Sequence, residues 1–565
     1  MSNEPTGAEA LLRMLELHGV DTVFGLCGDT SLPLYDAMYR DARGIRHILT
    51  RDERSAAYMA DGYARVTGRV GVCEGPSGGG ATYLLPGLVE ANESSVPVLG
   101  LTSDVSVASR GRFPLTELDQ TGLYRPLTKW NTVLDRAADL PRTMRAAFRA
   151  MTTGKPGSAH IGLPVDVQNG PVAESEIWAQ PEHARAPAWR SAPAPDEVER
   201  AAARLVAARR PVILVGGGVV SSGASDALAA LAERLDAPVV TTVSGKGALA
   251  ETHPFCAGVV GSNGGVPATR SVIDAADLVL LVACRAGSTT TEHWRHPKPS
   301  VPIVHIDVDP GVIAVNYRTE VALVGDARLA LEALDAAVAD RLAAAPPRDG
   351  SGRALVAEAR RAKWAAFAAL AASEETPIRP ERLIRELRSA LPDDAVVVAD
   401  PGTPCPYVSA YFELRRAGRH FVTNRAHGAL GYALSAAAGV KVGRPGARVV
   451  ALMGDGSFGF TVGELETLVR LNLPVTMIVV SNAVFGWIKA SQRAEYGGRY
   501  FSVDFGRTDH ARIAAAYGVD AHRVEDPRDL APTLARALAH DGPVLVDVIT
   551  QPLQDAAAPV AQWMG

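Results

Sequence analysis

Features that mark several classes of protein are scarce or missing in this chain. Only five cysteines occur among 565 residues, at Cys27, Cys73, Cys256, Cys284 and Cys405. They are scattered and show no paired spacing, which argues against a disulfide framework and against a zinc site. So sparse and odd a set is typical of proteins that work in a reducing compartment.

The sequence also lacks the marks of membrane and nucleic-acid proteins. No apolar run reaches the roughly 18 residues needed to cross a bilayer. The first residues, Met1–Thr6, show no basic region followed by an apolar core, so no secretory signal is visible. The formal charge of −5 and pI near 6.3 give no basic excess for nucleic acid. We expect a cytoplasmic protein that binds neither membrane nor nucleic acid.

What the chain does contain is an alternation of buried strands and helices. With 47% hydrophobic residues it is long enough for about three or four domains. The pattern predicts an α/β fold with three doubly wound parallel-sheet domains, at 1–175, 196–342 and 376–555. Stretches 178–195 and 343–375, rich in Pro, Ala and charge, read as linkers, and the second contains an Ala-rich helix.

The most informative stretch joins two strands of the third domain. An apolar run at 449–453 is broken by Gly454-Asp455-Gly456-Ser457, and a helix at 463–471 leads to a strand at 475–480 and then Asn482. Asp455 and Asn482 thus end parallel strands, where open sheets bind ligands. Their oxygens suit magnesium, and the amides around Gly456 can hold phosphate. Asp-Gly alone is a common turn, but the Asn 27 positions later makes the signal stronger.

This pattern resembles the thiamine diphosphate fingerprint, in which Gly-Asp-Gly is followed, one helix and one strand later, by Asn. The resemblance implies a Mg²⁺ ion held by Asp455, Asn482 and the main-chain carbonyl of Val484, and bridged to the cofactor's diphosphate. It also implies these cofactor contacts: Gly402, Thr403, Gly428, Leu430, Gly454, Gly456, Ser457, Asn482, Phe485 and Gly486. The three domains would then be pyrimidine-binding, central Rossmann-like and diphosphate-binding.

A second match surrounds Glu53. The segment Arg51–Arg65 resembles the one that carries the catalytic glutamate in the acetolactate synthase group of the superfamily that includes pyruvate decarboxylase. The resemblance implies that Glu53 bonds the aminopyrimidine ring and that Leu430 wedges beneath the cofactor. The alternative for Glu53 is an acid favoured by the helix dipole, and for Leu430 it is packing in a helix expected at 425–434. We expect desolvation to raise the pKa of Glu53.

Several candidate substrate residues depart from acetolactate synthases. Thr116 stands where they have a pocket Gln, Trp487 where they have Met, and Ser491 where they have Trp. These changes argue against plain acetolactate synthesis. Asp29 is a candidate proton shuttle or, equally, a helix cap. The remaining candidates are Cys27, Gly28 and His427, the last a possible acid or a solvated histidine.

We therefore predict decarboxylation of a 2-oxo acid with carboligation to a keto or aldehyde acceptor. A simple decarboxylase and a flavin-dependent oxidase of the pyruvate type remain alternatives, whereas a non-enzymatic homologue ranks last because Glu53, Asp455 and Asn482 are all present. Gly216–Gly218 lacks the spaced dinucleotide motif, and 284–289 departs from the FAD-bearing synthases, so we lean against FAD. Since the family builds its site between two subunits, we expect a homodimer at minimum and a homotetramer as the assembly.

Overall fold

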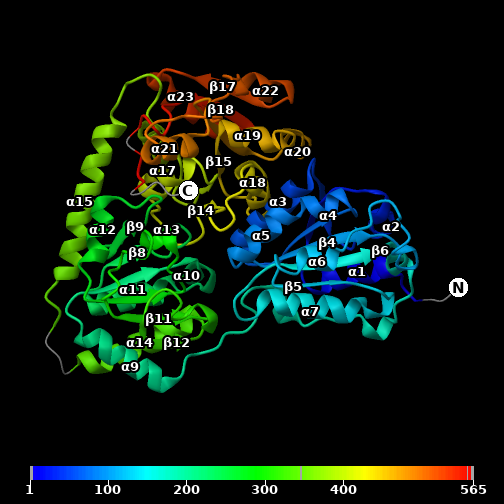
Figure 1. Ribbon diagram of the computed structural model, residues 1–565, viewed down its shortest axis with the longest axis horizontal. Coiled ribbons are helices and arrows are strands. Elements are labelled where there is room, and N and C mark those ends of the chain that lie inside the picture. Colours follow the sequence, from blue (N-terminus) through cyan, green and yellow to red (C-terminus); the bar gives the residue numbers. More distant parts are fainter. Residues whose placement is uncertain (1–3, 344–346, 557, 561–565) are drawn as a thin grey trace. The chain divides into compact units, whose positions relative to one another are not determined.

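The computed structural model describes residues 4–343, 347–556 and 558–560 and contains three six-stranded parallel sheets (Figure 1). Their strand orders are β2-β1-β3-β4-β6-β5, β12-β11-β10-β7-β8-β9 and β14-β13-β15-β16-β18-β17. The second sheet starts near its middle, at β7, and winds outward to both edges, whereas the first and third sheets start at β1 and β13, each next to an edge strand. This confirms the predicted fold class, while the exact domain boundaries stay a prediction.

The strands follow the apolar runs of the sequence. In the first sheet they are β1 (Thr22–Gly25), β2 (Arg46–Leu49), β3 (Gly71–Gly75), β4 (Val98–Asp104), β5 (Trp130–Val133) and β6 (Ala159–Pro164). In the second they are β7 (Pro211–Val215), β8 (Val239–Thr241), β9 (Cys256–Val259), β10 (Leu278–Val282), β11 (Ile303–Asp307) and β12 (Thr319–Val324). In the third they are β13 (Val396–Ala399), β14 (Phe421–Thr423), β15 (Val449–Gly454), β16 (Val475–Ser481), β17 (Asp520–Val524) and β18 (Val544–Ile549). Central strands such as β7 and β16 are buried along their whole length, as expected when helices cover both faces of a parallel sheet.

The α-helices precede, connect or follow the strands of the three sheets. Those of the first sheet are α1 (Gly7–Leu17), α2 (Leu32–Arg40), α3 (Glu53–Thr67), α4 (Gly79–Tyr83), α5 (Leu85–Glu93), α6 (Gln120–Tyr124), α7 (Leu140–Thr152) and α8 (Val165–Asn169). Next along the chain come α9 (Pro195–Ala207), α10 (Gly217–Ser222), α11 (Ser225–Leu235), α12 (Pro267–Asp274), α13 (Ser288–Thr291), α14 (Ala327–Leu342) and α15 (Ser351–Ala371). The last are α16 (Pro380–Ala390), α17 (Pro404–Tyr411), α18 (Tyr432–Gly443), α19 (Asp455–Thr461), α20 (Glu464–Arg470), α21 (Gly486–Glu495), α22 (His510–Ala516) and α23 (Pro527–Ala539). Among the described residues, no helix is both long and apolar enough to cross a bilayer.

The chain forms two compact units. The first contains residues up to Trp189 together with Asn424–Gly446 and Phe460–Val475, so that α18 and α20 accompany the first sheet. The second contains the rest, including the second and third sheets. Within it, α15 packs against α12 and α16 and so joins the helices of both sheets (Figure 1). This α15 is the Ala-rich helix expected in the second linker.

Helix α18 packs closely along α3 in the first unit. Contacts advance together along both helices, from Ser55 with Ser435, through Met59 with Gly439, to Val66 with Arg444, so the two helices run in the same direction. A Cβ on Gly439 would lie 1.9 Å from the main-chain oxygen of Met59, so only glycine permits this approach.

One expected helix is placed wrongly by the sequence analysis. The helix predicted at 425–434 begins only at Tyr432 in the structure, and the residues before it form a turn. Gly431, the N-cap residue, has φ +87°, which ends any helical path from the preceding residues. Leu430 therefore lies in the turn and not in a helix.

Candidate functional site

Asp455 and Asn482 lie side by side at the carboxyl ends of β15 and β16. Asp455 is the first residue of α19 and is buried. Its Oδ2 accepts hydrogen bonds from the main-chain amides of Asn482 at 2.8 Å and Ala483 at 2.6 Å, and its Oδ1 from the amide of Gly456 at 2.9 Å. Hydrogen bonds within the protein thus hold Asp455 next to Asn482, the two residues that the sequence predicts as metal ligands.

The oxygen ligands available around Asp455 suit a hard cation that completes its coordination shell with ligands from outside the protein. Burial raises the pKa of the Asp455 carboxyl, and the three amides oppose this rise by stabilising the charged form. In the described part of the chain, no group of three or more His, Cys, Asp or Glu side chains could hold a metal ion. A metal here would take one carboxylate, an amide oxygen and a main-chain oxygen, and would complete its shell with water or phosphate, as Mg²⁺ does. The residues present therefore fit a magnesium–diphosphate group.

The main chain after Asn482 is shaped for such a role. Val484 pairs with Asp504 in an antiparallel bridge, flanked by bonds from Phe485 N to Val503 O at 2.9 Å and from Phe505 N to Ala483 O at 3.1 Å. In this pattern the carbonyl of Val484 itself stays outside the ladder. Residues 503–505, which brace the predicted ligand Val484, were missed by the sequence analysis.

Other predicted diphosphate contacts gather around this point. Gly456 faces the ring of Phe485, and a Cβ on Gly456 would lie 2.8 Å from that ring. Buried Thr403 follows half-buried Gly402, and its hydroxyl oxygen is 3.1 Å from where Gly486 would carry a Cβ. Gly454 ends β15 and Ser457 is buried in the first turn of α19. All of these residues belong to the second unit.

Glu53 belongs to the first unit and starts α3. Its side chain is buried, and its Oε1 would lie 3.0 Å from a Cβ on Gly80, so the carboxyl borders the glycine-rich turn after β3. Burial raises the pKa of Glu53, as the sequence predicts, and the nearby charges of Asp52 and Glu74 raise it further. The loop before Glu53 is braced by Glu464, whose Oε1 accepts from Arg51 N at 2.9 Å.

The turn that carries Leu430 is anchored to the same unit. The amide of His427 donates to Glu90 Oε2 at 2.7 Å, while the His427 side chain is exposed. Because α3 and α18 run in the same direction, Glu53 and half-buried Leu430 lie at the same end of this helix pair. Gly428 lies in this turn with φ +77°. Packing inside a helix, the alternative for Leu430, does not apply.

Of the predicted substrate residues of the first unit, Thr116 belongs to a chain of hydrogen-bonded hydroxyls. Cys27 and Gly28 follow β1, and Gly28 occupies the N-cap position of the short helix Asp29–Ser31, so Asp29 is not its cap. Thr116 Oγ1 lies 2.7 Å from Ser77 Oγ, which lies 3.0 Å from Thr30 Oγ1. Thr116 has φ +71°, a strained conformation for a β-branched residue that is common at functional sites.

Trp487 and Ser491 lie one turn apart on α21 in the second unit. Trp487 is partly buried and packs against the apolar core of the third sheet, in line with the packing alternative. Ser491 is half-buried, and within the described chain its Oγ is buried without a hydrogen-bond partner. The i, i+4 spacing places both on one face of the helix.

A buried acid that was not predicted from the sequence interacts electrostatically with Glu53. Glu74 is buried at the end of β3, accepts a hydrogen bond from the hydroxyl of Tyr35, and lies 3.4 Å from His47 Nε2. The signal was present, because a glutamate interrupts an otherwise apolar strand at 71–75.

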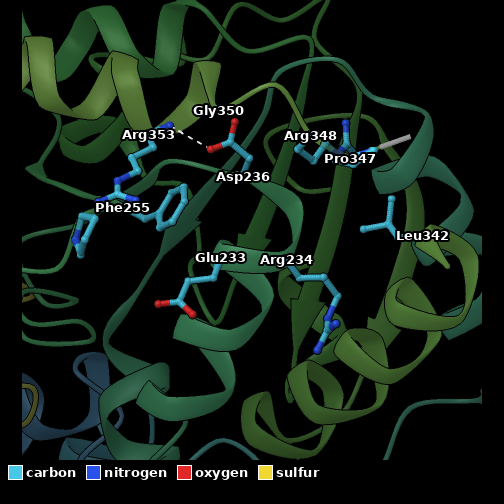
Figure 2. A pocket seen from close by; sticks show the side chains of 10 residues that line it. Glu233, Arg234, Asp236, Phe255, Leu342, Pro347, Arg348, Gly350 and Arg353 are labelled. Atoms are coloured by element: carbon cyan, nitrogen blue, oxygen red, sulfur yellow. Dashed lines mark hydrogen bonds between the residues drawn. The ribbon is translucent and has the colours of Figure 1, made fainter. Parts of the chain in front are cut away.

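A cavity of about 590 Å³ in the second unit is lined by none of these residues (Figure 2). Asp236 and Phe255, which line it, precede β8 and β9, so it opens at the amino ends of these strands. Its polar groups serve the fold: the carboxylate of Asp236 accepts from the amides of Gly352 at 2.9 Å and Arg353 at 3.0 Å and so holds the start of α15. Ligands of parallel sheets bind at the opposite edge.

Three protein-family descriptions match the chain. Residues 5–123 match "Thiamine pyrophosphate enzyme, N-terminal TPP binding domain", residues 198–334 match its "central domain", and residues 400–548 match its "C-terminal TPP binding domain". The matches cover the whole second sheet, strands β1–β4 of the first sheet and most of the third sheet.

Full-length relatives carry consistent names. The probable acetolactate synthase large subunit of Methanocaldococcus jannaschii is 34% identical over 557 residues, covering 97% of this chain and 92% of that protein. The acetolactate synthase of Arthrospira platensis is 33% identical, with 96% and 94% covered. The acetolactate synthase isozyme 3 large subunit of Escherichia coli is 32% identical, with 94% and 92% covered.

Proposed function

The chain belongs to the thiamine pyrophosphate enzyme family, and from this premise we propose that it decarboxylates a 2-oxo acid and transfers the acyl unit to a keto or aldehyde acceptor. It is a thiamine-diphosphate-dependent enzyme of the acetolactate synthase-like kind. The observation that carries the proposal is the hydrogen bond of 2.8 Å from the main-chain amide of Asn482 to the buried carboxylate of Asp455. It lies at the edge where parallel sheets generally bind ligands. The other functions considered from the sequence gain no support from the structure.

The proposed cofactor ligands divide by chemistry. Asp455, the side-chain oxygen of Asn482 and the carbonyl of Val484 hold Mg²⁺, and the amides around Gly456 with the hydroxyls of Thr403 and Ser457 hold the diphosphate. Support comes from the buried carboxylate, from the bridge that leaves the Val484 carbonyl outside the ladder, and from the lack of space for a side chain at Gly456.

When bound, thiamine diphosphate supplies the carbanion chemistry that breaks the bond between the carboxylate and the carbonyl carbon of a 2-oxo acid. Glu53 holds a proton at its carboxyl for the cofactor's ring nitrogen, a role supported by its burial and raised pKa. Leu430, at the same end of the α3–α18 pair, would provide an apolar contact that supports the cofactor. Asp29 stands free of the helix-cap role and serves as a proton shuttle on the substrate side.

We propose pyruvate as the first donor to test, because the relatives are named acetolactate synthases. We propose that Thr116, His427, Trp487 and Ser491 select the acceptor. Together with Cys27 and Gly28 they form the proposed substrate-binding region. The active assembly is a homodimer at minimum and a homotetramer as the full form, because Glu53 and Asp455 come from different sheets and the family joins them across subunits. We place the enzyme in the cytoplasm, where its five free cysteines stay reduced.

A panel of 2-oxo acids tests the proposal. Each acid is supplied with thiamine diphosphate and Mg²⁺, alone and with an aldehyde or second 2-oxo acid, and carbon dioxide and product mass are followed. The proposal expects carbon dioxide together with an acyloin or 2-hydroxy-keto product. Free aldehyde as the only organic product would replace carboligation by simple decarboxylation, and no carbon dioxide from any acid would overturn the proposal.

A further inference from the structure

A buried carboxylate lies directly behind the proposed metal ligands. Asp547 on β18 has a fully buried side chain, although it stands in the apolar strand Val544–Ile549. Its Oδ1 accepts from the hydroxyl of Ser481 and lies 3.3 Å from His510 Nδ1. Its Oδ2 accepts from the amide of His510 at 3.2 Å and from Arg523 Nη1 at 3.2 Å. Both oxygens are therefore satisfied, which a buried charge requires.

The hydrogen bonds fix where the protons lie. Ser481 Oγ donates its single proton to Asp547, so at 3.0 Å from His510 Nδ1 it can only accept. His510 therefore carries a proton on Nδ1, by assignment from the network. The result is a directed chain from His510 through Ser481 to Asp547.

This hydrogen-bonded cluster contacts the segments that carry both proposed metal ligands, Asp455 and Asn482. Ser481 directly precedes Asn482, and its main-chain oxygen accepts from Thr550 N at 2.9 Å. On the other half, the ring of Phe458, next to Ser457, meets the ring of His510 edge-on at 5.5 Å and 88°. His510 thus links helix α19, which begins at Asp455, to the end of strand β16, which precedes Asn482.

The three side chains also occur together in hydrolase triads, but the geometry here differs. In a triad the serine and the acid bond opposite nitrogens of the histidine ring, and the serine is open to substrate. Here Ser481 and Asp547 share Nδ1, and Ser481 gives its proton to the acid. Ser481, His510 and Asp547 are all buried. The cluster is built to hold a position and not to attack a substrate.

We propose that Ser481, His510 and Asp547 are positioning residues that set the distance between Asp455 and Asn482 for the metal. The proposal rests on the proposed magnesium site. Groups that orient metal ligands typically change metal affinity by about 10–100-fold when they are removed. The cluster acts through Asn482 on one side and through Phe458 on the other.

The test is Mn²⁺ binding to the full-length protein with saturating thiamine diphosphate, with free Mn²⁺ measured by electron paramagnetic resonance. Ser481→Ala removes the hydroxyl, and His510→Phe keeps a ring against Phe458 but removes Nδ1. Each is expected to raise the Mn²⁺ Kd by about 10–100-fold. Ser481→Thr, which keeps the hydroxyl, is expected to restore affinity, and a purely structural role would not give this pattern at unchanged melting temperature.

Thr476→Ala is the matched control, because Thr476 is a buried hydroxyl residue on the same strand that pairs with Val544 far from Asn482. It should leave the Kd unchanged. If Asp455→Ala loses Mn²⁺ binding while Ser481→Ala and His510→Phe keep the wild-type Kd, the positioning role is wrong. If Asp455→Ala and Asn482→Ala themselves bind Mn²⁺ as the wild type does, the magnesium site is wrong instead. Should His510→Phe not fold, Ser481→Ala with its Ser481→Thr rescue decides.

Discussion

Ser435 Oγ donates a hydrogen bond of 3.0 Å to Ser55 Oγ, although 380 positions separate the two residues in the chain. Both hydroxyls are fully buried, one near the start of α18 and the other near the start of α3. The bond therefore aligns the helix that begins at Glu53 with the helix that follows Leu430. Two residues proposed to meet the same cofactor ring are placed by one helix pair.

The seam between these helices should tolerate no side chain at Gly439. In Gly439→Val the new atoms would meet the main chain of Met59, where a Cβ lies at only 1.9 Å. We expect a loss of unfolding free energy of about 1–3 kcal/mol or more, as for other overpacked cores. Urea unfolding measures it. Gly446→Ala, where an added Cβ meets nothing within 4 Å, is the control and should be neutral; equal stability of both variants would refute the seam.

A buried ion cluster supports the same region. Arg65 Nε lies 2.7 Å from Asp61 and its Nη2 lies 3.0 Å from Glu90, both acids being fully buried. Arg65→Leu leaves these charges without a cation and should cost about 3–5 kcal/mol of unfolding free energy. Arg200→Leu, which breaks a surface ion pair with Glu197, should cost no more than about 1 kcal/mol. Denaturant titration of both variants checks the difference, and similar losses would argue against a special role for Arg65.

Glu53→Gln should separate cofactor binding from turnover. The amide keeps the shape of the carboxyl but cannot hold and release a proton, so carbon dioxide release should fall by about 10²–10⁴-fold. The Kd for thiamine diphosphate, measured by calorimetry, should change little, because the metal ligands lie in the other unit. Glu182→Gln, at an exposed position, is the control. Near-normal turnover in Glu53→Gln would remove Glu53 from the mechanism.

The pH dependence of the stability of the cofactor-free protein should report the raised pKa of Glu53. Burial raises the pKa of folded Glu53 above its ordinary value of 4.5, so the folded state binds this proton more tightly than the unfolded chain does. Its contribution therefore falls as the pH rises from about 4.5 through the raised pKa. Glu53→Gln lacks this loss, so its stability relative to wild type should increase across that window and then level off. Melting curves from pH 4 to 8 test this, and a constant difference would contradict it.

The residues of the fingerprint were predictable because they follow strands. Asp455 and Asn482 each end an apolar run, and parallel strands end at one edge, so their meeting follows from local pattern alone. Glu53 likewise follows a strand, β2, but its predicted role comes from the resemblance of the segment around it. The start of α18 was not predicted, because the turn at 425–431 has apolar spacing that reads as helix, and glycine at Gly431 could equally lie inside or before it.

Long-range polar contacts were beyond reach for a different reason. The bonds of His427 to Glu90 and of Ser481 to Asp547 join residues that are far apart in the sequence, and nothing in local spacing selects their partners. What the sequence offered was weaker: Glu74 and Asp547 each interrupt a buried apolar strand. A charged residue in such a strand requires a partner, so it signals that a network exists without naming its members.

The measurement that tests the central claim most directly is the stoichiometry of the reaction with pyruvate alone. Purified protein with thiamine diphosphate and Mg²⁺ would be supplied with pyruvate, and pyruvate consumed, carbon dioxide released and carbon–carbon-bonded product would be quantified together. Carboligation to a second pyruvate predicts two pyruvates consumed for each carbon dioxide and each product molecule, whereas carboligation to acetaldehyde predicts two pyruvates consumed and two carbon dioxides released for each acyloin. One carbon dioxide per pyruvate, with acetaldehyde as the product, would contradict carboligation.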